Sequence, residues 1–207
     1  MAVSSADIRI CFLGDSFVNG TGDDDALGWV GRVCADARAA GADVTCYNLG
    51  IRRQTSRDVL ARWRAECAPR LPAGCDGRLV LSFGVNDTTL ENGVPRVAHA
   101  EACATLRRLL IETAALPRVM VGPPPIDDDA QNARIATLAA EFARICADGG
   151  VPWVDLYAPL VADPVYRAEV AANDGAHPRR GGYARMAAIV LASPHWWFHL
   201  GATPPGA

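Results

Sequence analysis

Short apolar runs alternate with longer helical patterns along the chain, and this alternation restricts the fold more than any other feature. The runs are rich in Val, Ile and Leu on successive residues, as in strands buried on both faces; they span residues 8–13, 44–49, 78–83, 118–121 and 152–156. Alternating strands and helices predict a parallel sheet covered by helices. Because crossovers are right-handed, we expect an α/β fold: a doubly wound, five-stranded parallel sheet in a three-layer α/β/α sandwich.

Apolar residues recur at three- and four-residue spacing between several of these runs. The spacing predicts helices over residues 59–67, 106–113, 135–146 and 183–190. The connection 156–173 carries Pro, Asp, Arg and Glu among its apolar residues, which favours a surface loop. We expect a single domain over residues 1–200, followed by a frayed tail over 201–207.

Composition excludes several classes of function. The chain has 207 residues, 50% of them hydrophobic, and a formal net charge of -3, with its arginines scattered. These values favour neither disorder nor nucleic-acid binding. All twenty basic residues are Arg. The absence of Lys excludes a pyridoxal-phosphate lysine, a Ser–Lys dyad and a Walker-type phosphate loop.

The cysteines and the first residues of the sequence indicate the cellular location of the protein. The seven Cys are odd in number and include no C-x-x-C pair, so we interpret them as reduced core residues in a cytoplasmic protein. No apolar run reaches the length of a membrane span, and residues 1–7 lack a signal-peptide pattern. We therefore expect neither a membrane nor a nucleic acid as a partner.

Active sites of such sheets lie outside the carboxyl ends of the strands, which directs attention to three loops. The first three strands are followed by Gly14-Asp15-Ser16-Phe17, by Asn48-Leu49-Gly50 and by Gly84-Val85-Asn86-Asp87. A Ser at a strand end can act as a nucleophile, and an Asn amide can donate to a developing oxyanion. Taken singly, each segment also suits an ordinary role: a turn, a strand-ending glycine or a helix cap.

A fourth segment near the C-terminus supplies a base. Asp174 and His177 lie three residues apart in a Gly/Pro-rich loop, so one turn can hold both toward the same cleft. A lone loop His is usually a solvated surface residue, but His177 alone combines a nearby carboxylate with a place in a Gly/Pro-rich loop, whereas His99 lies on a predicted helix. Together the four segments provide a nucleophile, a base, an acidic orienter and oxyanion donors.

In this order, the four segments resemble the consensus blocks of the SGNH (GDSL-type) hydrolases, over residues 10–190. The resemblance implies the SGNH-hydrolase fold, which is the sandwich expected above. It implies that Ser16 is the nucleophile, His177 the base and Asp174 the residue that orients it. It also implies an oxyanion hole made by the backbone N–H groups of Ser16 and Gly50 and by the side chain of Asn86.

One departure from the common pattern is Phe17, where most members have Leu. The G-x-S-x-G elbow of ordinary α/β-hydrolases is absent, because Val18 stands two residues after Ser16.

The expected reaction is hydrolysis of a small, soluble ester through an acyl-enzyme, with no cofactor and no metal. No insertion is long enough for a lid over an acyl-chain trough, so we expect short acyl groups. Two alternatives stay open: acyl transfer by the same triad, and a non-catalytic small-ligand module of flavodoxin-like topology.

Other conspicuous features receive structural interpretations. Asp23–Asp25 and Asp127–Asp129 suit solvated acidic loops better than a metal site, and their charge would disfavour anionic substrates. The apolar segment Trp196-Trp197-Phe198 is expected to pack on the core, with a self-association surface or a substrate rim as the alternatives. Arg52 and Arg53 follow Gly50, so one of them can reach the cleft mouth, but the sequence favours surface exposure for both.

Overall fold

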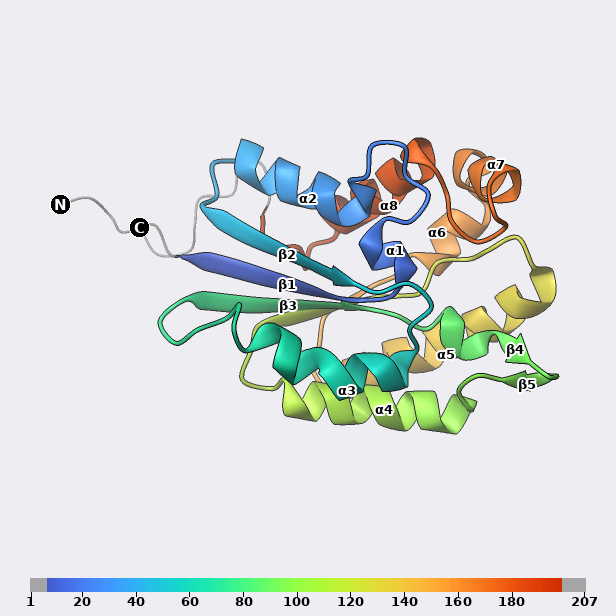
Figure 1. Cartoon of the computed structure of the whole chain (residues 1–207), viewed down its shortest axis with the longest axis horizontal. Helices are drawn as coiled ribbons and strands as arrows, with labels where there is room; N and C mark the ends of the chain where they lie inside the picture. The colour runs from blue at the N-terminus through green and yellow to red at the C-terminus, as the bar shows by residue number, and fades with distance from the viewer. Residues whose placement is uncertain (1–6, 199–207) are drawn as a thin grey trace.

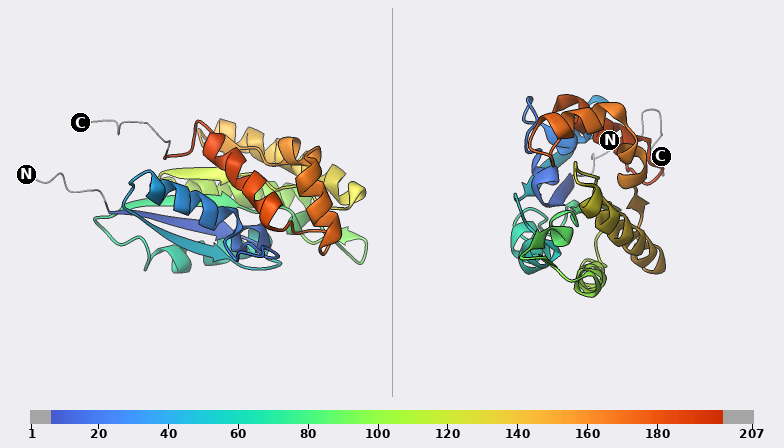
Figure 2. Two further views of the ribbon diagram at one scale, coloured as in Figure 1. Left: turned by 90° about the horizontal axis from the view of Figure 1, so that it is seen from above. Right: turned by 90° about the vertical axis from the view of Figure 1, so that its right-hand side faces the viewer.

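The computed structural model describes residues 7–198 and contains a five-stranded parallel sheet between two helical layers (Figures 1 and 2). The strand order is β2-β1-β3-β6-β7. The strands are β1 Ile8–Gly14, β2 Val44–Gly50, β3 Asp76–Ser82, β6 Arg118–Val121 and β7 Trp153–Val154. The predicted fold class is confirmed, although the last strand is shorter than its apolar run.

The register of the sheet brings the three loop motifs together. Gly14 at the end of β1 pairs with Gly50 on one side and with Ser82 on the other. The three strands therefore end at the same level, toward the right-hand edge of Figure 1. The segments that follow each strand start from neighbouring points, so a site at this edge needs no long loops.

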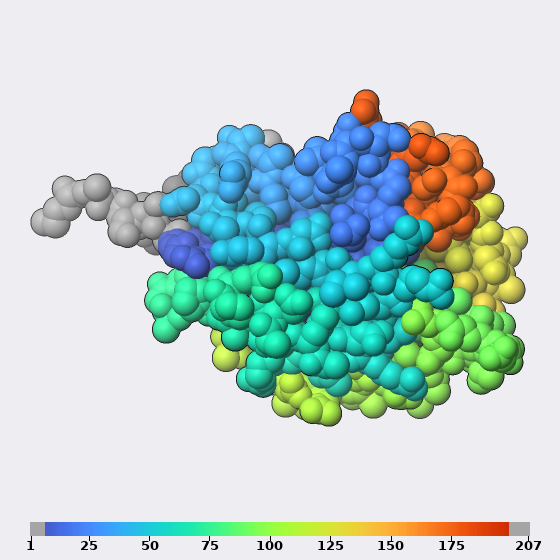
Figure 3. All heavy atoms as spheres, viewed as in Figure 1, coloured from blue at the N-terminus to red at the C-terminus, as the bar shows by residue number. Residues whose placement is uncertain are grey.

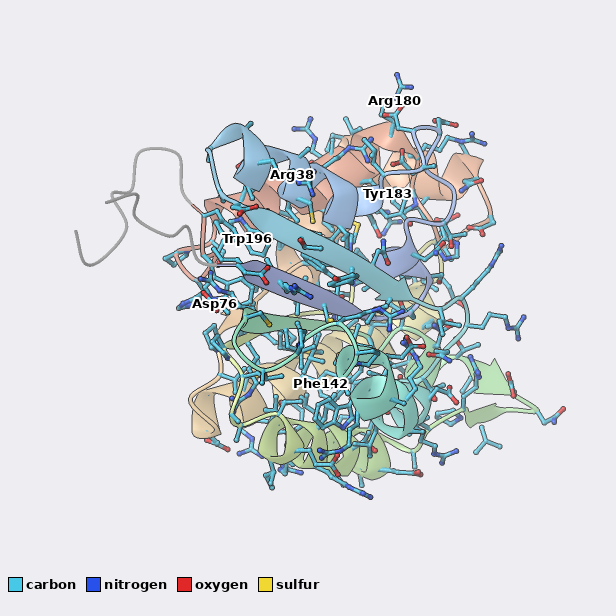
Figure 4. All side chains as sticks on the ribbon, turned by 60° about the vertical axis from the view of Figure 1, so that its left-hand side comes forward. Arg38, Asp76, Phe142, Arg180, Tyr183 and Trp196 are labelled. Atoms are coloured by element: carbon cyan, nitrogen blue, oxygen red, sulfur yellow. The ribbon has the colours of Figure 1, made fainter. Side chains whose placement is uncertain are left out.

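Helices cover both faces of the sheet. On one face lie α2 (Gly28–Ala39), α6 (Tyr157–Val161), α7 (Pro164–Ala172) and α8 (Arg180–Ala192); on the other lie α3 (Ser56–Cys67), α4 (His99–Glu112) and α5 (Asp129–Asp148). Tyr183 and Phe142, both fully buried, belong to different hydrophobic clusters, which the sheet separates (Figure 4).

The prediction of a surface loop over residues 156–173 was wrong. Those residues form α6 and α7, and Tyr166 is fully buried, with its hydroxyl donating to the Pro125 carbonyl at 2.8 Å. Asp163 caps α7 by accepting from the Tyr166 N–H at 2.8 Å, and Pro164 takes the first helical position. Asp and Pro there begin a helix rather than mark a loop.

Several shorter elements were not predicted. They are α1 (Ser16–Asn19), η1 (Asn86–Thr88) and the hairpin of β4 (Leu90–Glu91) and β5 (Val94–Pro95). Helix α2 was not predicted either, although its buried side chains follow helical spacing. The expected packing of Trp196 on the core is confirmed, since it is 2% exposed and contacts Phe12. The tail 201–207 lies outside the described residues.

Within residues 7–198, no helix combines the length and the apolar character that crossing a membrane requires.

Candidate active site

Ser16 begins α1 directly beyond the carboxyl end of β1. Asp15 caps this short helix by accepting from the Phe17 N–H at 3.0 Å, which satisfies one of the donors at the helix start. The Ser16 side chain is buried, and its Oγ lies 2.7 Å from Nε2 of His177. Figure 3 shows the blue segment around residue 25 beside the orange segment around residue 175, although they are far apart in the sequence.

His177 is held in place by Asp174. The Asp174 Oδ2 lies 2.8 Å from the His177 Nδ1, while Oδ1 accepts from the backbone N–H groups of His177 (2.8 Å) and Ala176 (3.1 Å). Burial alone would raise the pKa of Asp174, but these hydrogen bonds outweigh it and lower that pKa to about 2. Asp174 is therefore an anion at neutral pH, and it keeps a proton on Nδ1 so that Nε2 faces Ser16 as an acceptor.

The Asn86 amide lies at the start of η1, beyond the end of β3. Its Nδ2 donates to the Gln54 carbonyl at 3.0 Å and to the Asp15 carboxylate at 3.3 Å. Both amide protons thus have protein acceptors, and the longer bond to Asp15 is the weaker one. A substrate oxyanion at this point would compete for that proton.

The structure does not place Gly50 as the resemblance implied. The Gly50 N–H donates to the Asn48 side chain at 3.0 Å, and Gly50 does not line the cavity at Ser16. A Cβ on Gly50 would lie 2.1 Å from the backbone nitrogen of Asn19. This glycine therefore allows α1 to pack against the end of β2, and its N–H is not free for an oxyanion.

Arg53 lies at the cavity instead, in a backbone conformation unusual for its type. Its φ is 68°, a left-handed value that favours glycine. Arg53 lines the cavity, and its backbone N–H has no acceptor among residues 7–198. The sequence contains no signal for this role of Arg53, because a left-handed turn is normally predicted from a glycine and not from an arginine.

Arg62, on α3, connects the loops of the site without entering the cavity. It donates through Nη2 to the carbonyls of Gly14 (2.9 Å) and Leu49 (2.7 Å), and through Nε to the Gln54 side chain. Gln54 in turn accepts from Asn86. One guanidinium thereby positions the ends of β1 and β2 and, indirectly, the Asn86 amide.

Two buried carboxylates, Asp15 and Asp87, lie close to Ser16 and Asn86 in the sequence. Burial, with a contribution from the neighbouring charge of Asp87, raises the pKa of Asp15 to about 7. Burial likewise raises the pKa of Asp87 to about 6, although the Ser56 hydroxyl and N–H donate to it. Asp15 accepts from the Asn86 amide at 3.3 Å and Asp87 accepts from Ser56, and neither carboxylate is hydrogen-bonded to the His177 ring.

A cavity of about 260 Å³ opens at Ser16. Its lining comprises Ser16, Phe17, Arg52, Arg53, Val85, Asn86, Thr89, Arg96, Ile126, Gln131, Ala176 and His177. A larger cavity, about 420 Å³, lies beside α4 and α5, but its mainly apolar lining contains no paired nucleophile and base. In the described part of the chain, no cluster of His, Cys, Asp and Glu has the composition to hold a metal ion.

The acidic runs are not free loops. The side chain of Asp23 is fully buried, where it accepts from the N–H groups of Leu27 and Gly28 and pairs with Arg32. In the second run, Asp128 caps α5 by accepting from the Gln131 N–H at 2.8 Å. The interpretation of both runs as solvated loops was therefore wrong for Asp23 and incomplete for Asp128.

Comparison with known proteins identifies a family. The family model for the GDSL-like lipase/acylhydrolase family matches residues 12–185. No curated protein matches the chain in a sequence comparison.

Solved structures share the fold at low identity. A lipase/acylhydrolase from Enterococcus faecalis superimposes with a TM-score of 0.76 at 24% identity, over 94% of this chain and 99% of that one. A catalytic mutant of an acetylxylan esterase from Geobacillus stearothermophilus gives 0.76 at 21% identity, over 98% and 100%. An α/β hydrolase from the metagenome of Lake Arreo gives 0.76 at 22% identity, over 96% and 98%.

The family match extends over most of the chain, from β1 into α8, and it includes Ser16 and His177. The chain therefore belongs to the GDSL-like lipase/acylhydrolase family and is a carboxylic ester hydrolase.

Proposed function

We propose that this protein is a serine esterase that hydrolyses small, soluble carboxylic esters with short acyl groups. The observation that carries the proposal is a continuous hydrogen-bonded series: Asp174 to His177 at 2.8 Å, and His177 to Ser16 at 2.7 Å, beside an open cavity. Nucleophile, base and orienter within hydrogen-bond reach of one another are the arrangement that acyl transfer requires.

In the first half of the proposed reaction, Ser16 Oγ attacks the ester carbonyl while its proton passes to Nε2 of His177. The new C–O bond makes a tetrahedral oxyanion, and Asp174 stabilises the imidazolium. When the oxyanion collapses, the bond to the alcohol breaks and His177 returns the proton to the departing oxygen. In the second half, water attacks the acyl-enzyme with the same proton transfers and releases the acid.

The oxyanion requires donors that point at the developing charge. We assign this role to the Ser16 backbone N–H, the Asn86 amide and the backbone N–H of Arg53. Arg53 replaces Gly50 in this assignment, because the Gly50 N–H already donates to Asn48 whereas Arg53 lines the cavity.

The size of the cavity supports short acyl groups. At about 260 Å³ it is smaller than the 300–1,000 Å³ typical of sites for drug-sized ligands, so little acyl chain can be buried in it. Each buried CH₂ would add about 0.8 kcal/mol only while protein covers it. The seven cysteines are free thiols in the structure, which supports a cytoplasmic location as part of the proposal.

Steady-state kinetics on p-nitrophenyl acetate, with Ser16→Ala and His177→Ala as variants, test the proposal. Each variant is expected to lose about 10⁴-fold or more in kcat, because triad members act as a unit. Ser193→Ala, at the end of α8, is the matched control and should keep full activity. A rate above one tenth of wild type for Ser16→Ala would refute the assignment.

Two further outcomes separate the alternatives. If alcohols added to the assay yield new esters in preference to the free acid, the triad serves acyl transfer. If the protein binds small anions but turns over no ester, it is a binding module.

A further inference from the structure

Three arginines surround the mouth of the catalytic cavity. Arg52 and Arg53 follow the end of β2, and Arg96 follows β5, so two separate segments bring cationic side chains to one opening. No Asp or Glu lines that cavity. A neutral ester would gain no electrostatic attraction from this positive charge at the mouth of the cavity.

The acidic partners of these arginines neutralise them incompletely. Glu91 lies 3.1 Å from Arg96 and 3.9 Å from Arg53, so one carboxylate is shared by two guanidinium groups. Arg52 approaches Asp174 at 3.7 Å, but that carboxylate already accepts from the His177 ring and from two backbone N–H groups. The three side chains therefore keep a net positive charge at the opening.

The acidic runs do not compensate for this charge, contrary to the sequence-based expectation that they would disfavour anions. In the first run, Asp23 and Asp25 pair with Arg32, while Asp24 pairs with Arg179 at 3.1 Å. In the second run, Asp127 lies 3.9 Å from Arg167. None of these carboxylates lines the cavity.

Arg96 has the geometry of an anchor rather than of a free surface side chain. Its side chain is 19% exposed, and its Nη1 donates to the Arg53 carbonyl at 2.8 Å. This bond holds the left-handed turn at Arg53 and presents the Arg53 side chain, which is 77% exposed, to solvent at the opening. An anion entering the cavity meets guanidinium groups whose backbone is already positioned, which lowers the cost of ordering them.

We propose that the preferred substrates are esters that carry a carboxylate or phosphate group near the scissile bond, bound by Arg52, Arg53 and Arg96. This inference rests on the proposed esterase function and specifies its substrate class. The anion can belong to the acyl part or to the alcohol part, and the experiment distinguishes the two.

The experiment compares kcat/KM for two matched pairs of esters. For the acyl side, p-nitrophenyl hydrogen succinate is compared with p-nitrophenyl butyrate, after subtraction of the spontaneous rate. For the alcohol side, 4-acetoxybenzoate is compared with its methyl ester. The ratio of anionic to neutral kcat/KM is measured for wild type, Arg52→Gln, Arg53→Gln and Arg96→Gln, at low and at high KCl.

The ratio is expected to fall about two- to fivefold for each substitution, and to fall for wild type as salt screens the arginines. Arg107→Gln, on α4 away from the cavity, has the same change in net charge and should leave the ratio unchanged. Arg53→Gly serves as a second variant in case Arg53→Gln fails to fold, because glycine adopts the φ of 68° readily and also removes the charge. Its ratio should fall as for Arg53→Gln.

The outcomes are distinct. A fall confined to the succinate pair places the anion on the acyl side, and a fall confined to the acetoxybenzoate pair places it on the alcohol side. If neutral esters are hydrolysed but the ratio does not change in the arginine variants, this inference is overturned and the esterase function stands. If no ester of either kind is hydrolysed, the proposed function itself fails.

Discussion

Asp15, the buried residue before Ser16, should make the protein less stable as the pH rises. Its folded-state pKa is about 7, against 3.8 for an ordinary Asp, because burial penalises the charged form. The folded protein therefore binds this proton more tightly than the unfolded chain does. The resulting stability is fully present below pH 3.8 and is lost as the pH rises through about 7.

The magnitude follows from the shift. At about 1.4 kcal/mol per pKa unit, ionisation of Asp15 costs about 4 kcal/mol in total, of which about 3 kcal/mol falls between pH 5 and pH 8.5. Asp87, whose pKa is raised to about 6, contributes in the same direction. Its share over that interval is about 1.5 kcal/mol.

The perturbation is Asp15→Asn, which keeps an oxygen acceptor for the Phe17 N–H but cannot ionise. Urea unfolding at several pH values should show that the free energy of unfolding of the variant falls about 3 kcal/mol less than that of wild type between pH 5 and pH 8.5. Asp87→Asn should reduce the fall by about half as much. The reasoning is refuted if Asp15→Asn and wild type lose stability in parallel over this range.

Three other predictions concern the site. Asn86→Ala should lower kcat by about 10²- to 10³-fold with little change in KM, since the Asn86 amide donates to charge that develops in the transition state. In steady-state assays, a raised KM with an unchanged kcat would instead indicate that Asn86 binds the ground state. Arg62→Met should lower the free energy of unfolding in urea by about 2–3 kcal/mol, because the carbonyls of Gly14 and Leu49 lose their charged donor. Arg62→Lys should restore part of the lost stability, and equal stability of both variants and wild type would contradict this role of Arg62. On p-nitrophenyl esters, kcat/KM should peak at four carbons or fewer, and a peak at ten carbons would contradict the preference for short acyl groups.

The sheet and most of the candidate site could be predicted because they depend on local signals. Apolar runs identify the strands, and the parallel register then brings the ends of β1, β2 and β3 to one edge, so the segments of Ser16 and Asn86 had to approach each other. Asp174 and His177 share one loop, and a spacing of three residues is enough to pair them.

The role of Gly50 could not be predicted from the sequence. A glycine after a strand can present its N–H to a ligand or allow another backbone to approach closely, and the sequence is the same in both cases. Here the approach of Asn19 decides the matter, and this contact depends on how α1 packs. Similarly, the pairing of Asp23 with Arg32 depends on tertiary structure and cannot be recognised in a run of three Asp residues.

Helix α7 and the cavity mouth illustrate two other limits. Pro164 and Asp163 carried the correct signal for a helix start, but the polar residues around them favoured a loop. The arginines at the mouth come from segments more than forty residues apart in the sequence, and only the fold brings Arg96 to the carbonyl of Arg53.

Covalent labelling of the native protein with a fluorophosphonate tests most directly whether Ser16 is an activated nucleophile. The intact mass should increase by one phosphonyl group per chain, and peptide mapping should place that group on Ser16. Labelling should be absent in Ser16→Ala, absent in heat-denatured wild type, and strongly slowed in His177→Ala. A native protein that stays unlabelled, or that carries the group on another serine, would contradict the assignment of this site.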